Sequence, residues 1–167
     1  MNPDKLTIKS QEALQAARDL ARRKSHPELT PEHLLLALLG TEEGLVRPLF
    51  SKLGVDPALV AMEADRALDK LPQVSGGADI HVSPRLGHVL NGAGDEADRM
   101  KDDYVSTEHL LLAICAEKEG KAAELIRTLG VSRDDLLKAL AEVRGNQRVT
   151  DQYPEDKFQA LEQYCRD

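Results

Sequence analysis

The chain has 167 residues, of which 41% are hydrophobic and only 3% aromatic, so Leu, Ala and Val must build its core. Its formal net charge of −7 argues against a nucleic-acid-binding protein, because neutralising phosphates requires clustered Lys and Arg. No apolar run reaches the roughly 18 residues of a membrane span, and the N-terminus lacks the pattern of a signal peptide. We therefore expect a cytoplasmic protein with reduced cysteines.

Helix signals recur along the first half of the chain. Thr7 and Thr30 are predicted N-caps, and Pro31 and Pro57 stand at first helical positions, where a missing N–H costs nothing. Gly54 is the expected C-terminal stop of the third helix. Four helices are expected, the first starting after Thr7 and the others covering about 31–40, 44–53 and 57–71.

The second half repeats this order after a linker at 72–82 that contains Gly76 and Gly77. Ser83 and Pro84 restart the pattern, and Gly145 ends it. The tail at 146–167 is polar and extended at first; its later part, 155–166, is a candidate short helix that we expect to fray in isolation. Four more helices are expected at about 84–101, 107–117, 120–129 and 133–144, with no convincing strand anywhere.

The two halves align without a gap when the chain is shifted by 76 positions. The block TPEHLLLALL at 30–39 falls on STEHLLLAIC at 106–115, and Leu-Gly-Val at 53–55 falls on the same triplet at 129–131. Internal repeats of this kind determine the architecture. The sequence predicts an all-α fold of two four-helix repeats related by a pseudo-twofold axis, with repeat 1 at about 3–72 and repeat 2 at about 79–145.

Motifs for catalysis or metal binding are absent from the sequence. No phosphate-binding loop occurs, and the five histidines lack the spacing of a zinc site, so we expect no cofactor and no metal. Cys115 lies in an apolar run, where a small buried thiol is the ordinary expectation. A small enzyme that uses Cys115 or the histidines stays a rival interpretation, which burial of Cys115 would remove.

Two acids stand at matching places in the repeats. Glu32 and Glu108 each lie near the start of a helix, where a carboxylate complements the helix dipole by roughly 0.3–1 kcal/mol. The alternative is an acidic hook at the surface, used once per repeat. A second open question is the glycines at 87, 92 and 94 within one predicted helix, which indicate either close helix packing or a shallow groove lined by Val89 and Leu90.

The repeated blocks at 30–39 and 106–115, each followed by Leu-Gly-Val, resemble the Clp N-terminal repeat of the Clp AAA+ chaperone family. The segments LPQV at 71–74, VTDQ at 149–152 and PEDKFQALE at 154–162 are more similar to the ClpB branch than to ClpA or ClpC. The resemblance covers nearly the whole chain. It implies a domain at 1–145 and, at 146–167, a linker that leads to an AAA+ ATPase domain absent from this chain; Cys165 stands where the family usually has glycine.

The resemblance implies a substrate-engaging domain without catalytic activity of its own. Its expected ligands are exposed hydrophobic segments of unfolded or aggregated polypeptide, which it helps to feed into the pore of a homohexameric, ATP-driven disaggregase working with the DnaK system. The isolated domain is expected to be a monomer. The rival within the family is an N-domain of the ClpA or ClpC type, which docks folded adaptors for a protease.

Family members also imply which residues matter. Thr7, Asp102 and Glu108 match functional positions, as do apolar groove residues such as Leu90. We expect the three polar residues to lie at the surface near a groove that contains Leu90.

In ClpC relatives, the acid of each repeat captures phosphoarginine together with the hydroxyl residue that opens the repeat. Those positions are Glu32 with Thr7, and Glu108 with Ser83. This specificity does not transfer directly to a chain of the ClpB type.

Overall fold

The computed structural model describes residues 3–41, 44–75, 79–145, 148–152 and 154. Within these residues the chain forms eight α-helices, four in each repeat, as the sequence predicted. The predicted short helix at 155–166 lies outside the described residues. The helices are α1 (Ile8–Arg23), α2 (Pro31–Gly40), α3 (Val46–Lys52), α4 (Pro57–Asp69), α5 (Pro84–Arg99), α6 (Thr107–Cys115), α7 (Lys121–Thr128) and α8 (Arg133–Arg144); a short 3-10 helix, η1 (Pro3–Lys5), precedes them.

The repeats exchange short backbone pairings, which the sequence did not predict. Strand β1 (Glu28–Leu29) pairs in parallel with β2 (His81–Val82), so that Leu29 lies opposite Val82. An isolated parallel bridge joins Leu6 to Val105. The 76-residue shift maps Leu6 onto Val82 and Leu29 onto Val105. Each repeat therefore pairs its own copy of one segment with the other segment of its partner repeat. This reciprocal exchange is what a pseudo-twofold relation requires.

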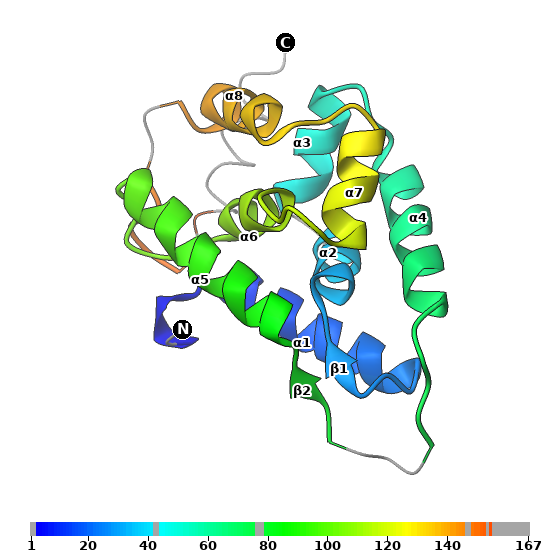
Figure 1. The fold of residues 1–167 in the computed structure, drawn as a ribbon. Coiled ribbons are helices and arrows are strands. Elements are labelled where there is room, and N and C mark those ends of the chain that lie inside the picture. Colours follow the sequence, from blue (N-terminus) through cyan, green and yellow to red (C-terminus); the bar gives the residue numbers. More distant parts are fainter. Residues whose placement is uncertain (1–2, 42–43, 76–78, 146–147, 153, 155–167) are drawn as a thin grey trace.

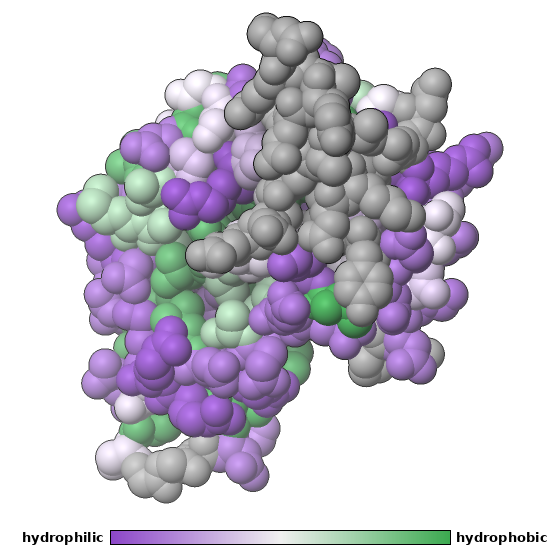
Figure 2. All heavy atoms as spheres, turned by 180° about the vertical axis from the view of Figure 1, so that it is seen from behind, coloured by the Kyte–Doolittle hydropathy of each residue, from purple (hydrophilic) through white to green (hydrophobic). Residues whose placement is uncertain are grey.

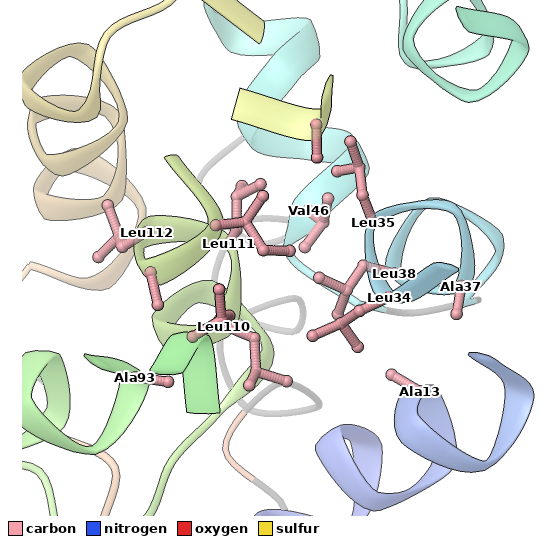
Figure 3. Packing of buried hydrophobic residues seen from close by; sticks show 14 of the residues in the cluster. Ala13, Leu34, Leu35, Ala37, Leu38, Val46, Ala93, Leu110, Leu111 and Leu112 are labelled. Carbon is pink, nitrogen blue, oxygen red and sulfur yellow. The ribbon is translucent and has the colours of Figure 1, made fainter. Parts of the chain in front are cut away.

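The middle of the molecule is formed by α2 and α6, with α1 against α2 and α5 against α6 (Figure 1). Because these two helices are surrounded, they are apolar on nearly every side. Five of their six leucines at 34–36 and 110–112 are buried, and Leu36 is partly exposed. Figure 3 shows Leu111 of α6 and Leu38 of α2 on the sides of their helices that face each other, next to Val46 of α3, whereas Leu112 lies on the far side of α6. Each buried Leu contributes roughly 1.5–3 kcal/mol by leaving water.

Turns recur at the same places in both repeats. Gly54 and Gly130 have φ of 79° and 85°, in the left-handed region that glycine adopts freely, and each ends the third helix of its repeat. Ser25 and Lys101, also repeat mates, both have φ of 59°. In the described part of the chain, no helix has the length and apolar character needed to cross a bilayer.

Candidate functional site

The N-terminus of α6 is capped reciprocally by a histidine. His109 Nδ1 accepts a hydrogen bond from the backbone N–H of Ser106 at 2.9 Å and lies 3.0 Å from the Ser106 hydroxyl. This is the arrangement of a capping box, with histidine at the position usually taken by Glu or Gln. Because a backbone N–H can only donate, Nδ1 is unprotonated, and the proton of the neutral ring resides on Nε2.

Asp102 accepts a hydrogen bond from His109 Nε2 and three others. His109 Nε2 lies 2.7 Å from Asp102 Oδ2, and the Arg144 guanidinium binds both carboxylate oxygens at 2.9 and 2.6 Å. The Val149 N–H donates to Asp102 Oδ1 at 2.8 Å. Burial alone would raise the pKa of this carboxyl, but the hydrogen bonds from His109, Arg144 and Val149 outweigh it and lower the pKa to about 2.

Ser106, His109 and Asp102 therefore stand in the order of a nucleophile, base and orienting acid. The exposed fractions of Ser106 and His109 are both 0%. Since Nδ1 of His109 already accepts a backbone hydrogen bond and no substrate carbonyl can reach Ser106, this group stabilises the helix start and cannot perform acyl transfer.

Repeat 1 builds the same cap with a different second partner. The Thr30 N–H donates to His33 Nδ1 at 3.0 Å, and His33 Nε2 lies 2.8 Å from Nδ1 of His26. His26 is the repeat mate of Asp102, so a neutral imidazole replaces the carboxylate. Burial first, then the repulsion between two imidazolium charges if His26 were also protonated, and the charge of Lys24 lower the pKa of His33 to about 4, although Glu32 opposes them.

Glu32 is buried and fully engaged across the repeat boundary. The Arg85 guanidinium binds its two oxygens at 3.0 and 2.9 Å, and the Ala122 N–H donates to Oε2 at 3.1 Å. Glu117 holds the same guanidinium at 3.0 Å. Gly120 is required beside it, because its φ is 139° and any Cβ there would clash with the guanidinium of Arg85.

Glu108 is in a different condition from its repeat mate. Its side chain has 0% exposure, and neither carboxylate oxygen has a hydrogen-bond partner among the described residues. Arg144 Nη1 lies 3.8 Å from Oε1, which is an ion pair without a hydrogen bond. The residue corresponding to Arg85 is Lys9, which pairs with Glu12 instead.

The surface placement expected for Thr7, Asp102 and Glu108 is wrong. Thr7 and Ser83 are buried N-caps, which accept from the backbone N–H of residues 10 and 86 at 3.2 and 3.0 Å. Asp102, Glu32 and Glu108 are buried as well. A polar residue at the start of a helix is better interpreted as a cap than as a ligand-binding residue. The helix starts in question also face the other repeat.

Leu90 is partly exposed and packs on the core. A shallow groove of about 230 Å³ does lie between α5 and α6, and Val89 and Gly92 line it, as expected for one of the two glycine interpretations. Leu90 is not among its lining residues. A Cβ at Gly92 would lie 3.6 Å from that of Ala113, so the helices also pack closely there.

A larger apolar groove, of about 600 Å³, crosses the repeat boundary between α4 and α7. Leu59 and Met62, one helical turn apart on α4, are 37% and 46% exposed, and Leu59 lines the groove. Apolar side chains at a three-residue spacing on an outer face were the available sequence signal. The apolar lining comprises Leu59, Ala67, Leu71, Leu125 and Leu129, with Glu63, Arg66, Lys70, Lys121 and Glu124 among the polar lining residues. Figure 2 shows the molecule from behind, and on that face hydrophobic residues gather between hydrophilic ones.

Two observations bear on an enzyme site and on a metal site. We expected Cys115 to be buried, but the residue as a whole is partly exposed. Its thiol is nevertheless largely withdrawn from water, which raises the pKa of the thiol to about 12, so little nucleophilic thiolate forms at neutral pH. The described residues contain no group of three or more His, Cys, Asp or Glu side chains placed to hold a metal.

Comparison with known proteins gives a consistent result. Residues 5–129 match the family model of the Clp repeat (R) N-terminal domain. The chain is 43% identical to the chaperone protein ClpB of Bacillus cereus over 171 aligned positions, and 42% identical to that of Bdellovibrio bacteriovorus over 163. These alignments cover 100% and 97% of the chain but 20% and 19% of the relatives, so the chain spans about a fifth of their length.

Solved structures show the same fold. The N-terminal domain of Hsp104 from Candida albicans superposes with a TM-score of 0.80 at 25% identity, covering 90% of this chain and 98% of that one. A ClpV N-domain in complex with a VipB peptide superposes with a TM-score of 0.66 at 24% identity, covering 83% and 86%.

Proposed function

Because the chain belongs to the Clp repeat N-terminal domain family, we propose that it binds exposed apolar segments of unfolded polypeptide, weakly and reversibly. The observation that carries this proposal is the groove between α4 and α7, which combines apolar lining residues with charges of both signs. Exposed apolar surface edged by polar residues is typical of binding sites for other chains.

The groove suits an extended or helical apolar segment better than a small polar ligand. Leu59, Leu125 and Leu129 offer contact area without a fixed set of hydrogen-bond donors, so many sequences would bind. Such contacts stabilise a complex by roughly 25 cal/mol per Å² of apolar surface buried. Weak binding matches a domain that must release what it captures.

From the family resemblance we further propose that the parent protein is a hexameric, ATP-driven disaggregase that works with the DnaK system in the cytoplasm. In that setting the domain helps to deliver captured segments to the pore. The polar residues Thr7, Ser83, Glu32, Asp102 and Glu108 support binding through the fold rather than by contact, since all are buried.

The adaptor or phosphoarginine interpretation receives less support at Glu32. Arg85 already occupies both oxygens of this carboxylate, and Glu117 holds the same guanidinium. A foreign guanidinium would have to displace Arg85 from a bidentate ion pair, which is the geometry that arginine and carboxylate favour most.

The test is an NMR titration of the 167-residue chain with a denatured, disulfide-free model protein. We expect the amide signals of α4 and α7 to shift. Leu59→Ser should weaken binding roughly fivefold, as expected for about 1 kcal/mol of lost apolar contact. Val82→Ser is the matched control, because Val82 is 46% exposed and does not line the groove.

Shifts confined to α5 and α6, with binding sensitive to Leu90→Ser, would place the site on α5 beside Leu90 instead. Binding that neither Leu59→Ser nor Leu90→Ser weakens, while both variants melt normally, would refute the proposed function at the α4–α7 groove and beside Leu90.

A further inference from the structure

Three segments far apart in the sequence cross beside the N-terminus of α1. The Val105 N–H donates to the Lys5 carbonyl at 2.7 Å, and the Thr7 N–H donates back to the Val105 carbonyl at 3.0 Å. Residues 148–152, the orange trace in Figure 1, run alongside this pairing. The Ile8 N–H, at the first position of α1, donates to the Gln152 carbonyl at 3.0 Å. One of the free N–H groups of the helix start is thus satisfied by the C-terminal segment.

Val149 holds the C-terminal segment at its other end. Its side chain is fully buried, its carbonyl accepts from the Asp103 N–H at 2.8 Å, and its own N–H donates to Asp102 Oδ1 at 2.8 Å. Both backbone groups of one residue are therefore used by two adjacent residues of a single loop. A buried side chain with both backbone groups paired is the condition of a residue that belongs to the packed fold.

Arg144 makes this docking site rigid. It stands in the last turn of α8 and is itself buried, and its two terminal nitrogens bind the two oxygens of Asp102. His109 fixes Oδ2 from the opposite helix at 2.7 Å. The carboxylate cannot rotate away from Val149 without breaking charge-assisted bonds, which are about twice as strong as neutral ones.

Repeat 1 lacks this device at the matching place. Leu68 corresponds to Arg144, and His26 corresponds to Asp102, so an apolar side chain and an imidazole replace the ion pair. The connector there is held by the Val74 N–H, which donates to the Ser25 carbonyl at 2.9 Å. The charged version therefore occurs in the repeat from which residues 148–152 emerge.

We propose that Arg144 and Asp102 form a latch that docks residues 148–152 on the helices and so fixes where the chain leaves them. Both are positioning residues: they set the direction of the segment after α8 and do not contact a captured polypeptide. At about 3.5 Å per extended residue, releasing the five residues lengthens the tether by roughly 17 Å. The latch goes beyond polypeptide binding and stands whether or not the groove between α4 and α7 is the binding site.

Amide hydrogen exchange of the 167-residue chain tests the latch. We expect the amides of Ile8, Asp103 and Val149 to be protected and to exchange together, faster than that of Leu111, because the segment opens as one unit while the helices stay folded. Exchange of the Val149 amide at the unstructured rate in the unaltered protein would overturn the proposal.

Variants then test the charged partners. Asp102→Asn should accelerate exchange at Ile8 and Val149 about 10- to 100-fold, the effect of losing a charge-assisted bond, and leave Leu111 protected. Asp103→Asn is the matched control, with the same charge change at an exposed neighbour. Unchanged exchange at Ile8 in Asp102→Asn, or equal acceleration by the control, would rule out the latch.

A variant that keeps every charge covers the case in which Asp102→Asn fails to fold. Val149→Ala shortens the buried side chain and leaves Asp102, Arg144 and His109 in place. It should accelerate exchange at Ile8 and leave the circular dichroism spectrum unchanged. Slow exchange at Ile8 in a folded Val149→Ala variant would contradict the docking.

Discussion

Residues 26 and 102 occupy the same place in the two repeats, but one is a histidine and the other an aspartate. Each is hydrogen-bonded to Nε2 of the histidine that caps the central helix of its repeat, at 2.8 Å for His26 and 2.7 Å for Asp102. The shared cap preserves the backbone. The variable partner decides whether that corner is neutral or carries a buried ion pair with Arg144. Duplicated folds can thus keep one architecture while one copy acquires a different electrostatic role.

The largest expected effect breaks this comparison at its charged side. Asp102→Ala leaves Arg144 without its bidentate partner and leaves the His109 and Val149 N–H groups without an acceptor. Removing one member of a buried ion pair costs roughly 3–5 kcal/mol. His26→Ala, the matched change in repeat 1, removes a neutral acceptor and should cost about 1–3 kcal/mol. Urea unfolding measures both, and equal losses would show that the ion pair has no special weight.

Acid should destabilise the repeats in successive pH ranges. The pKa of His33 is about 4 in the folded chain and about 6.5 when unfolded, so the unfolded state binds the extra proton first. Roughly 3 kcal/mol of stability should be lost as pH falls from 6.5 toward 4. The pKa of Asp102 is about 2, below its unfolded value of 3.8, so its contribution of about 2 kcal/mol is lost only as pH falls from 3.8 toward 2.

Urea unfolding from pH 7 to pH 2 covers both losses, and its part between pH 7 and pH 4 tests that of His33. In His33→Gln, which has no ring to protonate, the loss over that range should shrink. A loss as large as in the unaltered chain would mean that other groups are responsible.

The smallest expected effect concerns the acids at the start of the central helices. Arg85→Gln leaves the buried Glu32 carboxylate with the Ala122 N–H but without its guanidinium, at a cost of about 1–3 kcal/mol. Lys9 is the repeat mate of Arg85, and its ion pair with the exposed Glu12 spans 3.7 Å. Lys9→Gln should therefore cost less than about 0.5 kcal/mol. Thermal melting compares the two. Similar shifts would show that Arg85 does not join the repeats more strongly than a surface pair.

The predictability of the site differs from that of the fold. The capping role of Thr7 and Ser83 followed from their positions before helices, and the structure confirms it. The surface placement of Asp102 and Glu108 was wrong, because a turn before a helix is exposed only if no other element covers it. Here α8 and residues 148–152 cover it.

Local order was readable from the sequence because it depends on neighbours in the chain. The caps, the apolar helices α2 and α6 and the 76-residue shift fixed eight helices in two matching sets. Tertiary structure alone decided the rest. The Arg85–Glu32 pair and the Arg144–Asp102 pair join residues 53 and 42 positions apart, and the sequence does not state which surfaces meet at such distances. Burial then turned potential surface hooks into internal partners, since a charge withdrawn from water is stable only beside the groups that the fold brings to it.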